Sequence, residues 1–241
     1  MLIIFVSFLI IALVLTFDIY SDTKLFKDLL ISSLLAFGNL LFISFLLIYL
    51  LKFNKLTINL IIVLLFFINA SFIASKRYIF NFYNFASIFF SIFITTSIIL
   101  TLLYIAGILK LTANSLIPIA GMITAAGMRA IVLSLSYYKS KLKDLEEVIL
   151  NFFAIGASKK EVFKWLFKDI LNNTTVVIRD MLKAAGIVHI PGVMVGLLIA
   201  GIFPIKAAII QFALLSSMLF MFVFAPTISM NLIIKKEFKY I

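Results

Sequence analysis

Very few side chains in this sequence could take part in catalysis or metal binding. There is one histidine, His189, and no cysteine, which excludes disulfides and thiolate metal sites. No carboxylate lies deep within an apolar segment, and no GxxxxGK[ST] phosphate-binding loop is present. A hydrolase would need a nucleophile with a base or a metal cluster, and ion-driven carriers usually bury carboxylates. We therefore expect that the chain is not an enzyme, has no ATPase site and binds no cofactor itself.

The remaining candidates lie within or beside apolar segments. Arg129 is the one strong charge inside such a segment, and it either reaches back to the membrane surface or lines a transport pathway. His189 is either a hydrogen-bonded interior residue or a weak metal ligand. Asp180 and Lys183 have the i,i+3 spacing of a solvated ion pair, and a gate at the membrane surface would use the same residues.

The segment after His189 is rich in small residues. Gly192, Gly196 and Gly201 thin one side of a helix, which favours close packing against a neighbouring helix. Alternatively, Pro191 and Gly192 break the helix and expose backbone carbonyls to a cavity, as happens in transporters. We favour packing. Three methionines with adaptable side chains are candidates for lining a pathway: Met122, Met128 and Met194.

Long apolar segments must position these residues. The chain is 64% hydrophobic, and about 20 apolar residues are needed to cross a bilayer as a helix. The apolar runs are continuous rather than alternating, which excludes a membrane β-barrel. We predict an all-α, polytopic membrane protein with a single domain, residues 1–241. The seven predicted spans are about 2–17, 29–51, 56–74, 85–109, 116–138, 184–203 and 207–234.

The net charge of +11 is unevenly divided between the two sides of this predicted membrane domain. Sixteen of the 21 Lys and Arg residues fall in one set of alternate connections, and four fall in the other. Loops rich in Lys and Arg stay in the cytoplasm. We therefore expect the N-terminus outside and the C-terminus in the cytoplasm. The charge then reflects membrane topology, and no nucleic-acid partner is expected.

The connection between the fifth and sixth spans, residues 139–183, is charged and amphipathic. We predict one helix over 141–155, ended by Gly156, and a second helix begun by a capping box of Ser158 and Glu161. A helix–turn–helix on the basic side of a membrane protein offers a docking surface to a soluble partner. The apolar residues at helical spacing are Leu142, Leu145, Val148, Ile149, Phe152 and Phe153, then Val162, Phe163, Leu166 and Ile170, with Trp165 nearby.

Motifs spread in order from about 117 to 207 resemble the FetB/YbbM-type ABC transporter permease family, which is linked to bacterial iron export and to plant aluminium tolerance. Two departures lie at Asn39, where the family usually has Gln, and at Ala125-Ala126, where it tends to carry Gly-Asn. Before residue 110 the match is thin and rests on Asn69-Ala70 and Lys76-Arg77. The matching motifs are Ile117-Pro-Ile-Ala-Gly-Met122, Ile155-Gly-Ala157, Arg179-Asp180 with Lys183, Pro191-Gly-Val-Met-Val-Gly196, Ala200-Gly-Ile202, Pro204 and Lys206-Ala207.

This resemblance implies a homodimeric permease of the bacterial inner membrane that works with two copies of a separate ATP-binding subunit, which holds ATP and Mg²⁺. It also implies export of iron or another metal and a role in metal homeostasis, with His189 as a weak metal ligand. Alternatives are an ATPase-independent channel or ion-coupled carrier, an ABC exporter of a non-metal solute, and a scaffold that only tethers a partner. The candidate ATPase-coupling residues are Phe152, Phe153, Gly156, Ala157, Ser158, Glu161 and Trp165. The candidate pathway or gate residues are Met122, Met128, Arg129, Asp180, Lys183, His189, Pro191, Gly192, Met194 and Gly196.

Overall fold

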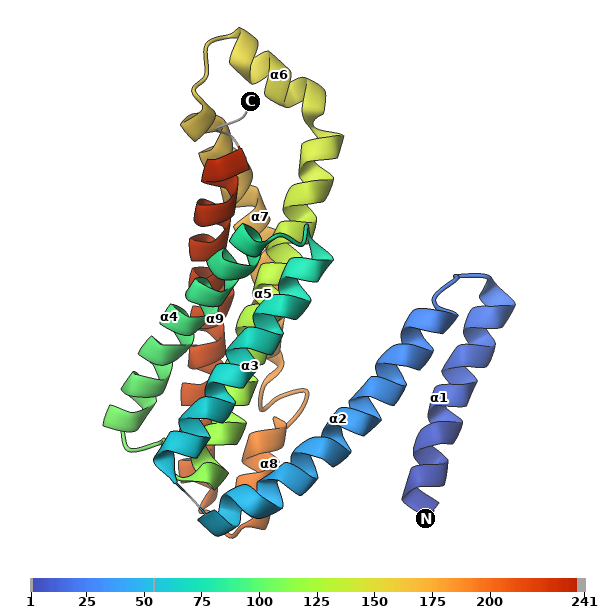
Figure 1. Ribbon diagram of the computed structural model, residues 1–241, viewed down its shortest axis with the longest axis vertical. Helices are drawn as coiled ribbons and strands as arrows, with labels where there is room; N and C mark the ends of the chain where they lie inside the picture. The colour runs from blue at the N-terminus through green and yellow to red at the C-terminus, as the bar shows by residue number, and fades with distance from the viewer. Residues whose placement is uncertain (1, 54, 238–241) are drawn as a thin grey trace. The chain divides into compact units, whose positions relative to one another are not determined.

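The computed structural model describes residues 2–53 and 55–237, and within them the chain forms nine α-helices and no strand (Figure 1). Six of these helices, α1 to α5 and α9, are long and apolar enough to cross a membrane. The predicted all-α, polytopic membrane protein is therefore confirmed. The helices are α1 Leu2–Ser21, α2 Phe26–Phe53, α3 Leu56–Arg77, α4 Phe82–Ile105, α5 Ala113–Asp144, α6 Glu146–Ala154, α7 Lys159–Ala184, α8 Gly192–Ile199 and α9 Pro204–Glu237.

The chain divides into two compact units, Met1–Lys55 and Leu56–Ile241. Unit 1 is the hairpin of α1 and α2. Its turn is held by the buried carboxylate of Asp18, which accepts hydrogen bonds from the Thr23 hydroxyl and from the backbone N–H of Leu25. The single domain predicted for residues 1–241 stays a prediction.

Unit 2 is a helical bundle in which α5 packs against α3, α4, α7 and α9. Small residues let α5 and α9 approach closely, as is usual between membrane helices. A Cβ atom at Gly127 of α5 would lie 2.5 Å from the Met221 Cε atom of α9. The buried Ser91 hydroxyl of α4 donates a hydrogen bond of 2.5 Å to the Ala225 carbonyl of α9. These contacts fix the helices that carry the candidate site.

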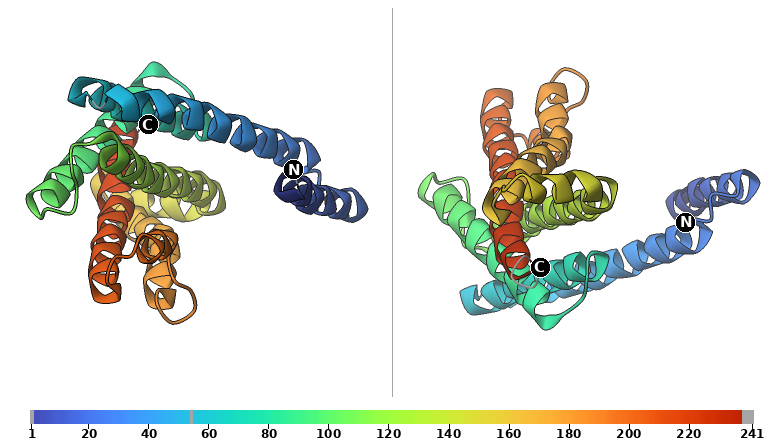
Figure 2. Two further views of the ribbon diagram at one scale, coloured as in Figure 1. Left: turned by 90° about the horizontal axis from the view of Figure 1, so that it is seen from below. Right: turned by 90° about the horizontal axis from the view of Figure 1, so that it is seen from above.

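Two of the predicted boundaries around residues 139–183 are wrong. The structure continues α5 without interruption to Asp144, and it breaks the helix predicted over 141–155 at Leu145, which separates α5 from α6. Helix α6 lies over one end of unit 2, which we term the α6 end (Figure 2). Helix α7 then returns along the bundle, packed against α5 and α9. Much of the predicted loop is therefore part of the bundle itself.

Candidate coupling and translocation site

The turn between α6 and α7 begins at Gly156, which has a φ of +90°. The N–H of Gly156 donates to the Phe153 carbonyl at 3.0 Å, and the N–H of Ala157 donates to the Phe152 carbonyl at 2.9 Å. This pair of bonds is a Schellman motif, in which glycine adopts the left-handed conformation that ends a helix. The predicted helix end at Gly156 is confirmed.

A complete capping box starts α7. The Ser158 Oγ atom accepts from the Glu161 N–H at 3.3 Å, and Glu161 Oε2 accepts from the Ser158 N–H at 2.8 Å. Oε2 also accepts a 2.6 Å bond from the Ser158 hydroxyl. These side-chain and backbone hydrogen bonds lower the pKa of Glu161 below its ordinary value of 4.5, because they favour the charged carboxylate. The predicted capping box is therefore confirmed, and the turn is short and well held.

Apolar side chains around this turn are only partly covered. Phe152 and Phe153 are half-buried, and the Phe152 ring packs against that of Trp165 with centroids 5.1 Å apart. Ile155, at the tip of the turn, is 81% exposed, and Trp165 is 43% exposed. The exposed apolar surface of this turn therefore centres on Ile155 and Trp165, with the two half-buried phenylalanines next to it.

The predicted apolar sides of the two helices are largely confirmed. Ile149, Val162, Leu166 and Ile170 are buried in unit 2, as the spacing predicts. Val148 is the exception, because it is exposed on the outer side of α6.

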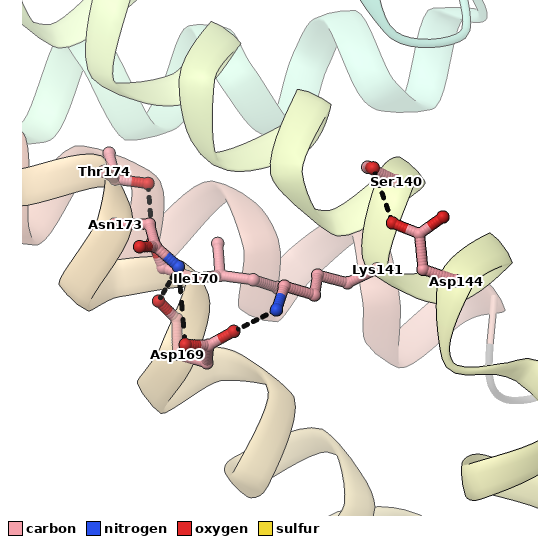
Figure 3. Close-up of polar contacts among 7 residues, drawn as sticks. All are labelled: Ser140, Lys141, Asp144, Asp169, Ile170, Asn173 and Thr174. Atoms are coloured by element: carbon pink, nitrogen blue, oxygen red, sulfur yellow. Dashed lines mark hydrogen bonds and ion pairs between the residues drawn. The ribbon is translucent and has the colours of Figure 1, made fainter.

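One ion pair ties α7 to the end of α5, and a hydrogen bond within α7 lies beside it. The Lys141 Nζ atom lies 2.8 Å from the Asp169 Oδ2 atom, and the Asn173 amide donates to the Asp169 carbonyl at 3.0 Å (Figure 3). Further along, Thr174 and Ile178 of α7 are fully buried. A displacement of the α6–α7 turn would therefore be carried along α7 into the bundle.

The predicted sixth span, 184–203, is not one continuous helix. After Ala184 the chain turns through Gly186, which has a φ of +81° and whose N–H donates to the His189 carbonyl at 2.9 Å. Helix α8 starts only after Pro191, which lacks an N–H group. Helix α8 has 8 residues and is too short to span a bilayer, for which about 20 are needed. Figure 1 shows this interruption level with the middle of α3, which is itself long enough to cross the membrane.

A buried glutamine on α9 holds the start of α8. The Met194 N–H donates to the Gln211 Oε1 atom at 3.0 Å, and Gln211 is only 6% exposed. Pro191, Met194 and Gln211 line a cavity of about 200 Å³ between α8 and α9. Gln211 is not among the site residues predicted from the sequence. The available signal was an amide side chain within an apolar segment, close to a proline-broken helix whose first N–H groups need acceptors.

The packing predicted for the glycines of α8 is wrong within this chain. A Cβ atom at Gly192 or Gly196 would meet no heavy atom within 4 Å. The alternative, a helix broken at Pro191 and Gly192, is what the structure has. Asp180 and Lys183, near the end of α7, form the predicted i,i+3 pair at 3.9 Å with both side chains largely exposed.

The other predicted pathway residues are spread over unit 2. Met128 and Arg129 of α5 line a half-open cavity of about 480 Å³, whereas Met122 is half-buried against the core. His189 is exposed in the turn before α8. Within residues 2–53 and 55–237, no three His, Asp or Glu side chains gather as a metal-binding group.

The whole chain fits one family of membrane proteins. Residues 1–238 match the uncharacterised protein family UPF0014. The chain belongs to this family. A relative from Escherichia coli K12, named as a probable iron export permease protein, FetB, is 30% identical over 195 residues, covering 79% of this chain and 75% of the relative.

Two further relatives are similar over shorter or more divergent stretches. The Arabidopsis thaliana protein ALUMINUM SENSITIVE 3 is 26% identical over 128 residues, 53% of this chain and 47% of that protein. The Bacillus subtilis membrane protein YjkA is 26% identical over 185 residues, 77% of this chain and 74% of its own length. No solved structure gives a significant match to the chain.

Proposed function

We propose that this chain is the membrane permease of an ABC transporter, driven by ATP that a separate subunit hydrolyses, and that it exports iron or another metal. The observation that carries the proposal is the α6–α7 turn. It presents exposed apolar side chains at its tip and is joined by one helix to an interrupted membrane crossing. The name of the Escherichia coli relative supports the permease and its metal cargo.

Helix α7 would transmit movement from the ATPase to the membrane. It has 26 residues, which corresponds to about 39 Å of helix at 1.5 Å per residue. At one end it begins in the capped turn, and at the other it ends at the interruption before α8. Closure of an ATP-binding dimer would push on Ile155 and Trp165 and tilt α7. The interrupted crossing absorbs the movement, because Gly186 and Gly192 permit backbone rotation that a continuous helix does not.

The turn between α7 and α8 is our proposed part of the translocation pathway. The N–H groups of residues 185–189 bond only within the turn and to the end of α7, so the turn interrupts the regular helix. Irregular backbone at membrane depth must face protein or water rather than lipid. Interrupted helices supply binding groups at this depth in several transporter folds. We propose that two copies of the chain form a homodimer, with the exposed turns and His189 facing a shared aqueous path. Asp180 and Lys183, in the last turns of α7 beside the interruption, would then gate it.

The charge of unit 2 favours placing the α6 end in the cytoplasm. The connections there carry many lysines, and the opposite end carries only Lys110 and Lys206 among the described residues of the unit. The positive-inside rule then orients the protein in a bacterial inner membrane with its C-terminus in the cytoplasm. An ATP-hydrolysing partner would meet the α6–α7 turn on that side.

The experiment that tests this function uses the absence of cysteine from the chain. Ile155→Cys at the tip and Ile105→Cys at the end of α4 change two highly exposed isoleucines, 81% and 74% exposed, at opposite ends of unit 2. Each tagged variant is expressed in its native host, treated with a photoactivatable maleimide and purified from membranes.

We expect the Ile155→Cys variant, and not the Ile105→Cys variant, to crosslink to a subunit that hydrolyses ATP. Ferrous iron should stimulate ATP hydrolysis by the purified complex. Crosslinking to an ATP-hydrolysing subunit whose activity does not respond to iron would support the permease function but contradict iron as the cargo. If neither variant crosslinks to an ATPase, the coupling assignment is wrong, and a channel or ion-coupled carrier becomes the better description.

A further inference from the structure

Two arginines from different helices line one cavity of unit 2. Arg77 is the last residue of α3, Arg129 lies within α5, and both side chains are exposed. They border the same half-open cavity of about 480 Å³. No carboxylate lines it, and neither guanidinium forms an ion pair with any side chain that the structure describes. The cavity therefore carries two uncompensated positive charges.

The rest of the cavity is apolar apart from one hydroxyl. Besides the arginines and Ser136, its walls consist of hydrophobic side chains from α3, α5, α7 and α9. A ligand that fits this lining has an anionic group next to a long apolar part. The apolar lining residues are Ile73, Met128, Val132, Leu133, Val177, Ile178, Met181, Met218 and Phe222.

The cavity lies where membrane lipid has its headgroups. Helix α3 has 22 residues, about 33 Å of helix at 1.5 Å per residue, which matches the hydrocarbon thickness of a bilayer. Arg77 at its end is therefore at the boundary between hydrocarbon and headgroups. Basic pockets between membrane helices at this depth bind anionic headgroups, and guanidinium groups bind phosphate through paired hydrogen bonds.

We propose that this cavity binds an anionic phospholipid of the leaflet at the α6 end. The lipid phosphate lies between Arg77 and Arg129, and an acyl chain lies along the apolar wall. The methionines from α5, α7 and α9 suit a flexible chain, because unbranched thioether side chains adapt to irregular surfaces. Since α7 forms one wall, a bound lipid would brace the helix against α3 and α5. This inference does not depend on the transported cargo.

The test is native mass spectrometry of the full-length purified chain, titrated with dioleoylphosphatidylglycerol or dioleoylphosphatidylcholine. We expect the anionic lipid to remain bound at concentrations where the zwitterionic lipid dissociates. Arg77→Gln with Arg129→Gln should weaken phosphatidylglycerol binding by about tenfold or more, because two charge-assisted contacts are lost. Lys76→Gln is the matched control. Lys76 carries the same charge, but its Nζ atom lies 4.3 Å from the Phe72 ring centroid and does not line the cavity.

Three results would overturn the proposal. The first is equal retention of the two lipids by the wild-type chain, which requires no variant to fold. The second is an equal loss in Lys76→Gln, which would indicate a general effect of surface charge. The third is displacement of bound phosphatidylglycerol by millimolar inorganic phosphate, which would assign the arginines to a free oxyanion rather than to a lipid.

Discussion

Gly156 offers the sharpest test of how the coupling turn is built. Its φ of +90° is a conformation that side chains with a Cβ atom rarely adopt, and a Cβ atom there would meet no neighbour within 4 Å. Gly156→Ala therefore changes backbone strain without a steric clash. The left-handed conformation costs an alanine about 1–2 kcal/mol, and 1.4 kcal/mol corresponds to a factor of ten in an equilibrium constant. Opening of the turn should become about 5- to 30-fold more frequent.

Hydrogen exchange measures this opening directly. The amides of Gly156 and Ala157 are the donors of the Schellman motif, so their exchange rates report whether the turn is intact. We expect Gly156→Ala to accelerate exchange in the peptide that contains them, and Gly156→Asn to have a smaller effect, because asparagine tolerates the left-handed region. In membranes that contain the ATPase, Gly156→Ala should also reduce transport-coupled ATP hydrolysis.

The control is Gly38→Ala in the middle of α2. A Cβ atom at Gly38 also meets nothing within 4 Å, but its φ is not positive. Alanine is preferred to glycine inside a helix by about 1 kcal/mol, so exchange around residue 38 should slow or stay unchanged. If Gly156→Ala leaves exchange at 156 and 157 unchanged, or if asparagine disturbs the turn as much as alanine, the account of this turn is wrong.

Three further predictions follow from single contacts. Gln211→Leu leaves the Met194 N–H of α8 without an acceptor and should destabilise the α8 region by about 1–3 kcal/mol, which hydrogen exchange measures. Ser217→Ala is a near-neutral control, because the Ser217 hydroxyl bonds only to a carbonyl of its own helix. The lowered pKa of Glu161 means that its capping contribution is complete above about pH 4.5 and is lost as the pH falls through the folded-state pKa. As the pH falls through that range, amide exchange at the start of α7, corrected for its intrinsic pH dependence, should rise in the wild type and stay flat in Glu161→Gln. Gly127→Ala should be tolerated, because the end of the flexible Met221 side chain can move. Gly127→Ile should destabilise the fold by about 1–3 kcal/mol. Equal melting temperatures for the wild type and Gly127→Ile would contradict this packing.

Local chemistry explains why much of the coupling turn could be predicted from sequence. Gly156, Ser158 and Glu161 lie within six consecutive residues, so their pattern alone identifies a helix end and a helix start. The apolar residues of α7 also follow their spacing, because the buried side of a helix repeats every three or four residues. The membrane spans were predictable for the same reason, since length and continuous apolar composition are local properties.

The interrupted crossing depends on contacts that spacing does not reveal. The segment from 184 to 203 has the composition of an ordinary span, and its glycines suit either close packing or a break. Gln211 decides between these, because its side chain reaches an amide 17 positions earlier in the chain and replaces the missing helical partner. Arg77 and Arg129 likewise share a cavity only because α3 and α5 pack side by side. Such pairings arise from the tertiary arrangement and have no signature at fixed sequence spacing.

The most direct test of the central claim is transport by the purified complex. The tagged chain is purified with whatever ATP-hydrolysing subunit remains bound and is reconstituted into phospholipid vesicles loaded with an iron-sensitive fluorophore. ATP and ferrous iron are added outside the vesicles, so only complexes whose α6 end and ATPase face the outer medium can use them. We expect iron accumulation that requires ATP and that is abolished by Ile155→Asp, because this change removes the apolar tip of the coupling turn. Iron uptake that proceeds equally without ATP, or a chain that purifies with no ATPase, would contradict it.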